Sequence, residues 1–252
     1  MISIEKDTVR LYALLAELDA LPGQGTPLAV AMAQKTFPNR GVYFFRELGE
    51  MFSAIDGTPR ITRVGTHAVS LDSKATLRSR LRAHAGSKTG SGNHRGSIFR
   101  LHVGNAMLKS DELSIPTWGV GSIAPMALRA DTHAQEAERL LELRVSGHIA
   151  SMPVLWIDVP DDAGPNSERA FIERNAIALL SNKMSPLAAP SETWLGRFSV
   201  RAEIRASQLW NLKHVGETYD PLFLEALDRA VERTLASEGR VDGVAVTKRF
   251  AL

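Results

Sequence analysis

The chain has 252 residues, a hydrophobic fraction of 44% and a formal net charge of +2. A chain of this length can bury one sizeable core, so we expect a globular fold and not disorder. It contains no cysteine, which excludes a disulfide framework, a thiolate zinc site and a cysteine nucleophile. The first residues carry charges where a signal peptide needs an apolar run, and no later stretch approaches the length of a membrane span. These features predict a cytoplasmic protein with no membrane partner.

The first part of the chain predicts a helix followed by a β-hairpin. Residues from about Thr8 to Leu21 place leucines at helical spacing, within an N-terminal helical segment that we assign to residues 1–39. The runs Gly41 to Phe45 and Arg60 to Gly65 are rich in β-branched and aromatic residues, and a turn-prone stretch joins them. These two runs predict the paired strands of the hairpin.

A second helix and a loop follow the hairpin. The stretch from Lys74 to Ala85 has no glycine or proline and predicts a helix with one apolar edge. Arg80 and His84 stand four residues apart on this helix, so their side chains lie one above the other at the border of the core. The glycine-rich stretch after this helix contains Lys88 and predicts a flexible cationic loop.

The rest of the central region predicts an insertion, a buried strand and another helix. The insertion spans about residues 110–150, with Asp131 to Val145 as its helix. Val154 to Val159 is a short apolar run between prolines, which suits a buried strand. Ser167 can cap a helix that runs from Glu168 to about Ser181.

The C-terminal part, residues 191–252, predicts an extension that ends in a helix announced by Asp220 and Pro221. Trp194 and Trp210 in this part suit either core packing or stacking on nucleic-acid bases, and the sequence leaves both readings open. Together the elements predict an α+β fold, in which a small mixed, mainly antiparallel β-sheet is flanked by helices.

Positive charge is concentrated between Gly57 and Lys109, where Asp72 is the only acidic residue. Such a segment repels itself unless a polyanion lies against it, so a phosphate backbone is a fitting partner. A solvated basic face is the alternative. The candidate backbone contacts in or after the cationic loop are Lys88, His94, Arg95 and Arg100.

Glu168 shares a helical face with Phe171, Ile172 and Asn175, so its carboxylate lies beside residues that must be buried. A buried carboxylate needs a partner because an unpaired charge is costly to bury. The candidate partners are an arginine, a set of backbone donors or a metal ion.

The polar residues follow one another in an order that resembles the GIY-YIG nuclease family. The matching positions are Gly41-Val42-Tyr43, Arg63-Val64-Gly65, Arg80, His84, Glu168 and Asn182. The resemblance covers roughly residues 41–182, and it implies a nuclease domain over residues 40–190, with the insertion at about 110–150 and the C-terminal extension packed on it. It also implies that DNA is the substrate.

The resemblance implies a role for each matching side chain. Tyr43, polarised by His84, would act as the general base on water, and Arg80 would bind the phosphate. Glu168 would supply the one protein ligand to Mg²⁺ (or Mn²⁺), while Asn182 would hold local structure within the site.

One position departs from the family pattern, because Arg63 stands where the second triplet begins with tyrosine. Arginine there could contact the phosphate or pair with Glu168. The departure leaves an alternative open, a catalytically weakened nuclease-like module for DNA binding or assembly. A homodimer or sequential nicking would let one site per chain cut both strands, and restriction, mobile-element defence and DNA repair all remain open as settings.

Overall fold

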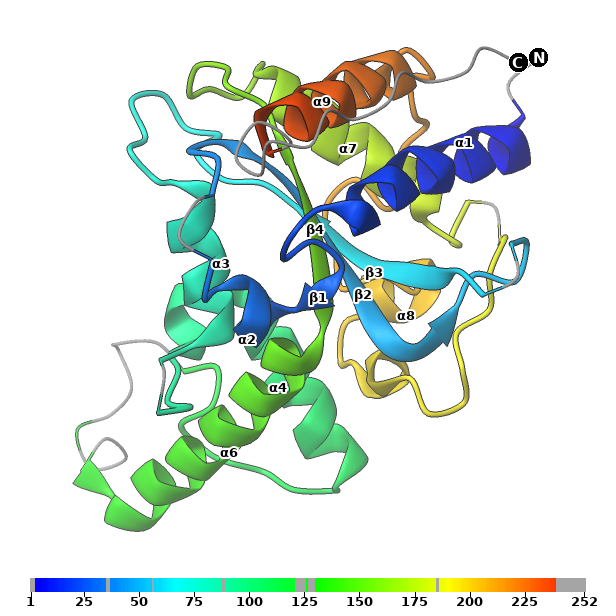
Figure 1. The fold of residues 1–252 in the computed structure, drawn as a ribbon. Helices are drawn as coiled ribbons and strands as arrows, with labels where there is room; N and C mark the ends of the chain where they lie inside the picture. Colours follow the sequence, from blue (N-terminus) through cyan, green and yellow to red (C-terminus); the bar gives the residue numbers. More distant parts are fainter. Residues whose placement is uncertain are drawn as a thin grey trace.

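The computed structural model describes residues 3–34, 37–55, 57–87, 89–120, 126, 130–184 and 186–238. Within these residues four strands form one antiparallel sheet in the order β1-β4-β2-β3. The strands are β1 Thr26–Pro27, β2 Gly41–Met51, β3 Pro59–Gly65 and β4 Pro153–Asp158. Helices lie on both faces of the sheet, so the α+β fold predicted from the sequence is confirmed (Figure 1).

The predicted hairpin is formed by β2 and β3. They pair with Tyr43 opposite Gly65 and Phe45 opposite Arg63. Residues directly opposite one another share a face of the sheet, so Arg63 projects to the same side as the two aromatic rings. On the other side of β2, β4 places Trp156 opposite Tyr43. One face of the sheet therefore combines large aromatic side chains with an arginine.

Each face of the sheet is covered by its own group of helices, with a hydrophobic core between helices and sheet. Figure 1 shows one group on one side of the sheet: α1 Ile4–Ala16, α7 Glu168–Leu180 and α9 Phe223–Glu238. The other group lies on the opposite side: α3 Leu77–Ala85, α4 Ile98–Ser110 and α6 Thr132–Ser151. The aromatic face, which carries Tyr43 and Phe45, meets this second group.

Short helical elements complete the described fold: η1 Glu17–Ala20, α2 Leu28–Ala31, η2 His94–Gly96, η3 Leu195–Phe198 and α8 Ala202–Ser207. Among the residues that the structure describes, no helix combines the length and the apolar character needed to cross a bilayer.

Capping side chains set the starts of three helices. Ser167 accepts a hydrogen bond from the Ala170 N–H at the start of α7, and Asp131 caps α6 in the same way. At α3 Thr76 and Ser79 form a reciprocal capping box, so this helix begins at Leu77. The predicted starts at residues 131 and 168 therefore agree with the structure, and α3 begins slightly later than predicted.

Further helices differ from the prediction. α6 continues past Val145 to Ser151, and α9 begins at Phe223, after Pro221. α1 begins at Ile4, earlier than expected, because Ser3 caps it, and the chain leaves the α-helical path after Ala16. α4 was not predicted. Its buried residues include Phe99 and Val103, and also His102, so they surround the helix instead of forming one apolar stripe.

The terminal segments pack closely on the central part of the chain. α1 contacts α7 and α9, and β1 extends the sheet by pairing with β4. Trp194 and Trp210 are buried and donate their indole N–H groups to Glu47 Oε2 at 2.9 and 3.1 Å, respectively. His148 of α6 lies 3.0 Å from the other oxygen of Glu47. These two tryptophans are thus part of the hydrophobic core. The predicted segment boundaries, at residues 39/40 and 190/191, stay predictions.

His102 is a buried histidine on α4, and neither of its ring nitrogens has a hydrogen-bond partner within the described part of the chain. Burial, followed by the positive charges of Arg63 and Arg201, lowers its pKa to about 4 from an ordinary 6.5. As the pH falls below 6.5 the unfolded chain takes up this proton, whereas the folded chain does not until about pH 4. The free energy of unfolding should therefore fall across this window.

We predict that His102→Leu reduces this acid-induced loss of stability by about 2 kcal/mol. Urea unfolding at several pH values between 6.5 and 4 measures the effect. His133→Leu, which removes an exposed histidine at the start of α6, serves as the control and should keep the parent pH profile. Identical profiles for His102→Leu and the parent would contradict the prediction.

Candidate active site

The hairpin and α3 bring Tyr43 and His84 into direct contact. Tyr43 Oη lies 2.8 Å from His84 Nε2, and His84 Nδ1 lies 2.8 Å from Ser97 Oγ. Tyr43 and His84 have no exposed surface. The Tyr43 ring lies across Gly65, where an added Cβ would stand 2.2 Å from Tyr43 Oη. Only glycine at this position leaves room for the ring.

The environment of His84 fixes its charge. Burial, followed by the positive charges of Arg63 and Arg80, lowers the pKa of His84 well below its ordinary value, so the ring is neutral near pH 7. A neutral imidazole has one N–H donor and one acceptor nitrogen. When Nδ1 donates to Ser97, Nε2 accepts the hydroxyl proton of Tyr43 and polarises the phenol.

Arg80 projects from α3 one turn before His84 and is partly exposed. Its Nε is buried without a hydrogen-bond partner, and the described residues offer the guanidinium no ion pair. Burial is the main influence on the pKa of both His84 and Glu173, and the positive charge of Arg80 acts to lower each of them. Arg80 is therefore near both groups and is available to an external anion.

Arg63 is buried and already engaged. Its Nη1 donates to the backbone carbonyl of Trp210 at 2.6 Å, and its guanidinium carbon lies 4.5 Å from the centroid of the Phe99 ring. Like Arg80, it acts electrostatically on both His84 and Glu173. Arg63 thus links the C-terminal segment to the same group of side chains.

Glu173, in the middle of α7, is the carboxylate that the structure brings to this group. Its Oε1 accepts the backbone N–H of Thr66 at 3.1 Å, directly after Gly65. Burial raises the pKa of the Glu173 carboxyl, although Arg63, the Thr66 N–H, His214 and Arg80 all act to lower it. The cations around Glu173 therefore compensate its charge only in part.

Glu168, predicted as the metal ligand, does not reach this group. It opens α7, and its Oε1 pairs with Arg229 of α9 at 3.2 Å. Five residues of α-helix turn the side-chain direction by about 140°, so Glu168 and Glu173 project from different faces of α7. On α7 it is therefore Glu173, and not Glu168, whose carboxylate is held at the end of β3. The sequence contained a signal for Glu173, because Ala176, Ile177 and Leu180 follow it at helical spacing. Glu173 therefore shares a face of α7 with apolar residues.

Asn182 lies just after α7 and holds local structure. Its Nδ2 donates to Gln208 Oε1 and to the backbone carbonyl of Ala188, while its Oδ1 accepts the Leu187 N–H at 3.0 Å. All of its amide groups are thus used within the fold, as expected for the structural role given to Asn182.

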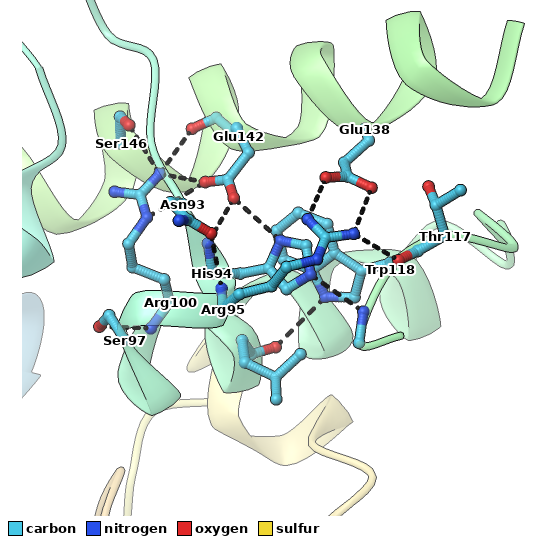
Figure 2. Close-up of polar contacts among 12 residues, drawn as sticks. Asn93, His94, Arg95, Ser97, Arg100, Thr117, Trp118, Glu138, Glu142 and Ser146 are labelled. Atoms are coloured by element: carbon cyan, nitrogen blue, oxygen red, sulfur yellow. Dashed lines mark hydrogen bonds and ion pairs between the residues drawn. The ribbon is translucent and has the colours of Figure 1, made fainter. Parts of the chain in front are cut away.

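Two of the predicted DNA contacts belong instead to a buried ion-pair network (Figure 2). His94 Nδ1 lies 2.9 Å from Glu142 Oε1, and the backbone N–H of His94 donates to the same oxygen. Arg100 is fully buried, donates to Glu142 Oε2 from both Nε and Nη2, and also reaches Ser146 Oγ at 2.9 Å. His94 and Arg100 are therefore inaccessible to DNA, and both join α6 to the segment that begins α4.

Arg95 is more exposed but is also paired. Its guanidinium binds both carboxylate oxygens of Glu138 at 2.5 and 3.1 Å and donates to the backbone carbonyl of Thr117 (Figure 2). Arg95 therefore ties η2 to α6 and to residue 117. Lys88, the remaining predicted DNA contact, lies outside the described residues.

Among the described residues, no group of three or more His, Asp or Glu side chains is arranged to hold a metal ion. A single carboxylate suffices for Mg²⁺ when the substrate supplies phosphate oxygens, because this ion keeps several of its waters. Glu173 fits such a site, since one of its oxygens is fixed by Thr66 and its charge is only partly compensated.

A family model described as the GIY-YIG domain matches residues 3–237. The chain belongs to the GIY-YIG family. The match extends on both sides of the predicted range 40–190, so it includes α1 and α9. Membership indicates a nuclease, and it agrees with the resemblance found in the sequence. No curated protein and no solved structure matches the chain.

Gly65→Ala should disturb the GIY-YIG domain at its Tyr43 contact. The new methyl group would overlap the phenol, so we expect a loss of about 1–3 kcal/mol in the free energy of unfolding. Gly147→Ala on α6 is the matched control, because a Cβ at Gly147 meets no atom within 4 Å. In urea unfolding the control should be neutral or stabilised by about 1 kcal/mol. Equal stability of Gly65→Ala and the parent would refute the tight packing.

Arg100→Met should reveal Arg100 as a structural residue of the GIY-YIG domain. The change leaves the Glu142 carboxylate without its main buried partner, which costs about 3–5 kcal/mol. Arg95→Met removes the more exposed pair with Glu138 and should cost no more than about 1 kcal/mol. Urea unfolding compares the two variants. A smaller loss for Arg100→Met than for Arg95→Met would contradict the assignment.

Proposed function

We propose that the chain is a divalent-cation-dependent nuclease that hydrolyses phosphodiester bonds in DNA. The observation that carries the proposal is the hydrogen bond that holds Glu173 at Thr66, at the end of β3, where the charges of Arg63 and Arg80 act on it. The same two arginines act on His84, which is bonded to Tyr43. Hydrolysis of a phosphodiester needs a proton acceptor for water and positive groups for the charge that develops on the phosphoryl oxygens. These side chains supply both kinds of group.

Arg80 binds the scissile phosphate in this proposal. Its planar guanidinium offers several N–H donors, stays charged at any working pH and forms no ion pair within the described residues. Arg63 adds positive charge from the interior, because its Nη1 remains on Trp210.

Glu173 is the residue that would hold the cation, Mg²⁺ or Mn²⁺. When bound, such an ion neutralises charge on the phosphate and helps to stabilise the leaving oxygen. Its positive charge would also balance the carboxylate that Arg63 and Arg80 compensate only in part.

Tyr43 is the general base in this proposal, and His84 orients it. The hydroxyl lies against Gly65 and His84 and has no exposed surface. A base must meet water, so the proposed role requires DNA binding to open one side of this contact. As Tyr43 takes a proton from water, its own hydroxyl proton passes to Nε2 of the neutral His84 ring, which also keeps the phenol in place.

A second candidate function, a DNA-binding or assembly module without cleavage, is favoured by the same burial of Tyr43. Arg63 also favours this second function. Its guanidinium is bound to Trp210, and it replaces the tyrosine whose phenol could take part in a proton relay. Such a module would bind DNA with strong salt dependence and form no product with any divalent ion.

Cutting both strands with one site per chain requires two copies or two successive nicks. We include a homodimer in the proposal on this ground alone. Appearance of nicked circles before linear DNA in a plasmid time course would favour successive nicks by a single copy.

Glu173→Gln should abolish cleavage, while Glu168→Gln should keep it. The first change removes the charge that holds the cation, and we expect a loss of at least about 100-fold in rate. The second change removes only the exposed pair with Arg229. The measurement is cleavage of long, sequence-diverse DNA with Mg²⁺ or Mn²⁺, with thermal unfolding to show that both variants fold.

The opposite result, in which Glu168→Gln is inactive and Glu173→Gln cuts normally, would return the metal role to Glu168. Retained DNA binding by the parent, with no product under any of these conditions, would instead select the binding module.

A further inference from the structure

The segment of residues 208–220, between α8 and α9, lies along the outer edge of β3. The Trp210 N–H donates to the carbonyl of Thr62 at 2.7 Å. Asn211 binds both backbone groups of Val64, accepting from its N–H at 3.2 Å and donating to its carbonyl at 2.8 Å. The order of the sheet leaves this side of β3 without a neighbouring strand, so the segment satisfies an otherwise open edge.

The same segment is also fixed to α7. The Ser181 hydroxyl donates to the carbonyl of Val215 at 2.6 Å, and the Asp220 N–H donates to Asn175 Oδ1 at 2.7 Å. In the sequence, His214 lies between Asn211, which is bound to β3, and Val215, which is bound to the end of α7. Its position is therefore determined by both the strand and the helix that carry the site.

His214 has a strained backbone and an oriented ring. Its φ of 66° is in the left-handed region, which costs a residue other than glycine about 1–2 kcal/mol. Its Nδ1 lies 2.8 Å from Glu217 Oε1, while Glu217 Oε2 binds Arg174 at 2.6 Å. The side chain is 29% exposed, and no described residue bonds its Nε2. Such strain persists where surrounding contacts hold it, and it is often found at functional positions.

His214 is also close to Glu173. Asn211 binds Val64 and Glu173 binds Thr66, so the two attachment points lie about 7 Å apart along β3. Glu217, which bonds His214, also binds Arg174, the residue that follows Glu173 on α7. His214 thus stands at the rim of the proposed site.

We propose that His214 is a further substrate-contacting residue, whose Nε2–H donates to a phosphate oxygen of the bound DNA while Glu217 holds Nδ1–H. This inference rests on the proposed function. Glu217 is then a positioning residue, because it holds Nδ1 and leaves Nε2 facing outward. The C-terminal segment would in this way add a phosphate contact to those from α3.

The test uses His214→Gly, because glycine removes the imidazole and also relieves the left-handed strain. A purely structural role predicts a less stable protein, whereas a substrate contact predicts equal or higher thermal stability with weaker DNA binding. We expect the Kd for a fluorescein-labelled 30-base-pair duplex, measured in EDTA to prevent cleavage, to rise about tenfold. His214→Asn, which tolerates this backbone and keeps a donor, should give an intermediate Kd.

Glu112→Gly is the matched control, since Glu112 has a φ of 56° at the end of α4 and is exposed. It should share the gain in stability and keep the parent Kd. The inference is overturned if His214→Gly binds DNA as the parent does, or if it binds more weakly and also has a lowered Tm. In either case, cleavage of DNA by the parent would leave the nuclease proposal intact. A parent that neither binds nor cleaves DNA overturns both.

Discussion

The packing of the Tyr43 ring on Gly65 is the contact on which the arrangement of the site depends. Directly opposed residues of a hairpin have Cβ atoms about 5 Å apart, so a large ring crosses the partner strand only where that strand has no Cβ. The crossing brings the Tyr43 hydroxyl to His84 on α3, and His84 in turn reaches Ser97 at the start of α4. One missing side chain on β3 therefore sets how β2 and two helices meet.

Buried arginines give this region its electrostatic character. Arg63 and Arg100 lie within the protein and need partners of their own, and they add to the effect of burial that keeps His84 neutral. Arg100 finds a carboxylate in Glu142, and Arg63 finds a carbonyl and an aromatic ring. Part of the positive charge between Gly57 and Lys109 is therefore internal, so the cationic segment is a weaker guide to a DNA-binding surface than its composition indicates.

The sequence was sufficient where local spacing decides the structure. It predicted the hairpin and the start of α7, because strand pattern and capping are local, whereas the pair Tyr43 and His84, 41 residues apart, came from the resemblance to the GIY-YIG family. The choice between Glu168 and Glu173 could not be made this way, since both share a helical face with apolar residues, and only packing decides which face meets β3. Arg100 was misjudged because its partner Glu142 comes 42 residues later.

The attachment of residues 208–220 to β3 has a consequence for synthesis of the chain on the ribosome. Asn211 follows Val64 by 147 residues, so the intervening chain is made before the outer edge of β3 is covered. Until then Arg63 lacks its carbonyl acceptor and the strand presents free backbone groups. A product of premature termination before Trp210 would thus contain the hairpin, α3 and α7 and still lack the fixed geometry around Arg63. Completion of the site is in this way delayed until residues 208–220 have left the ribosome.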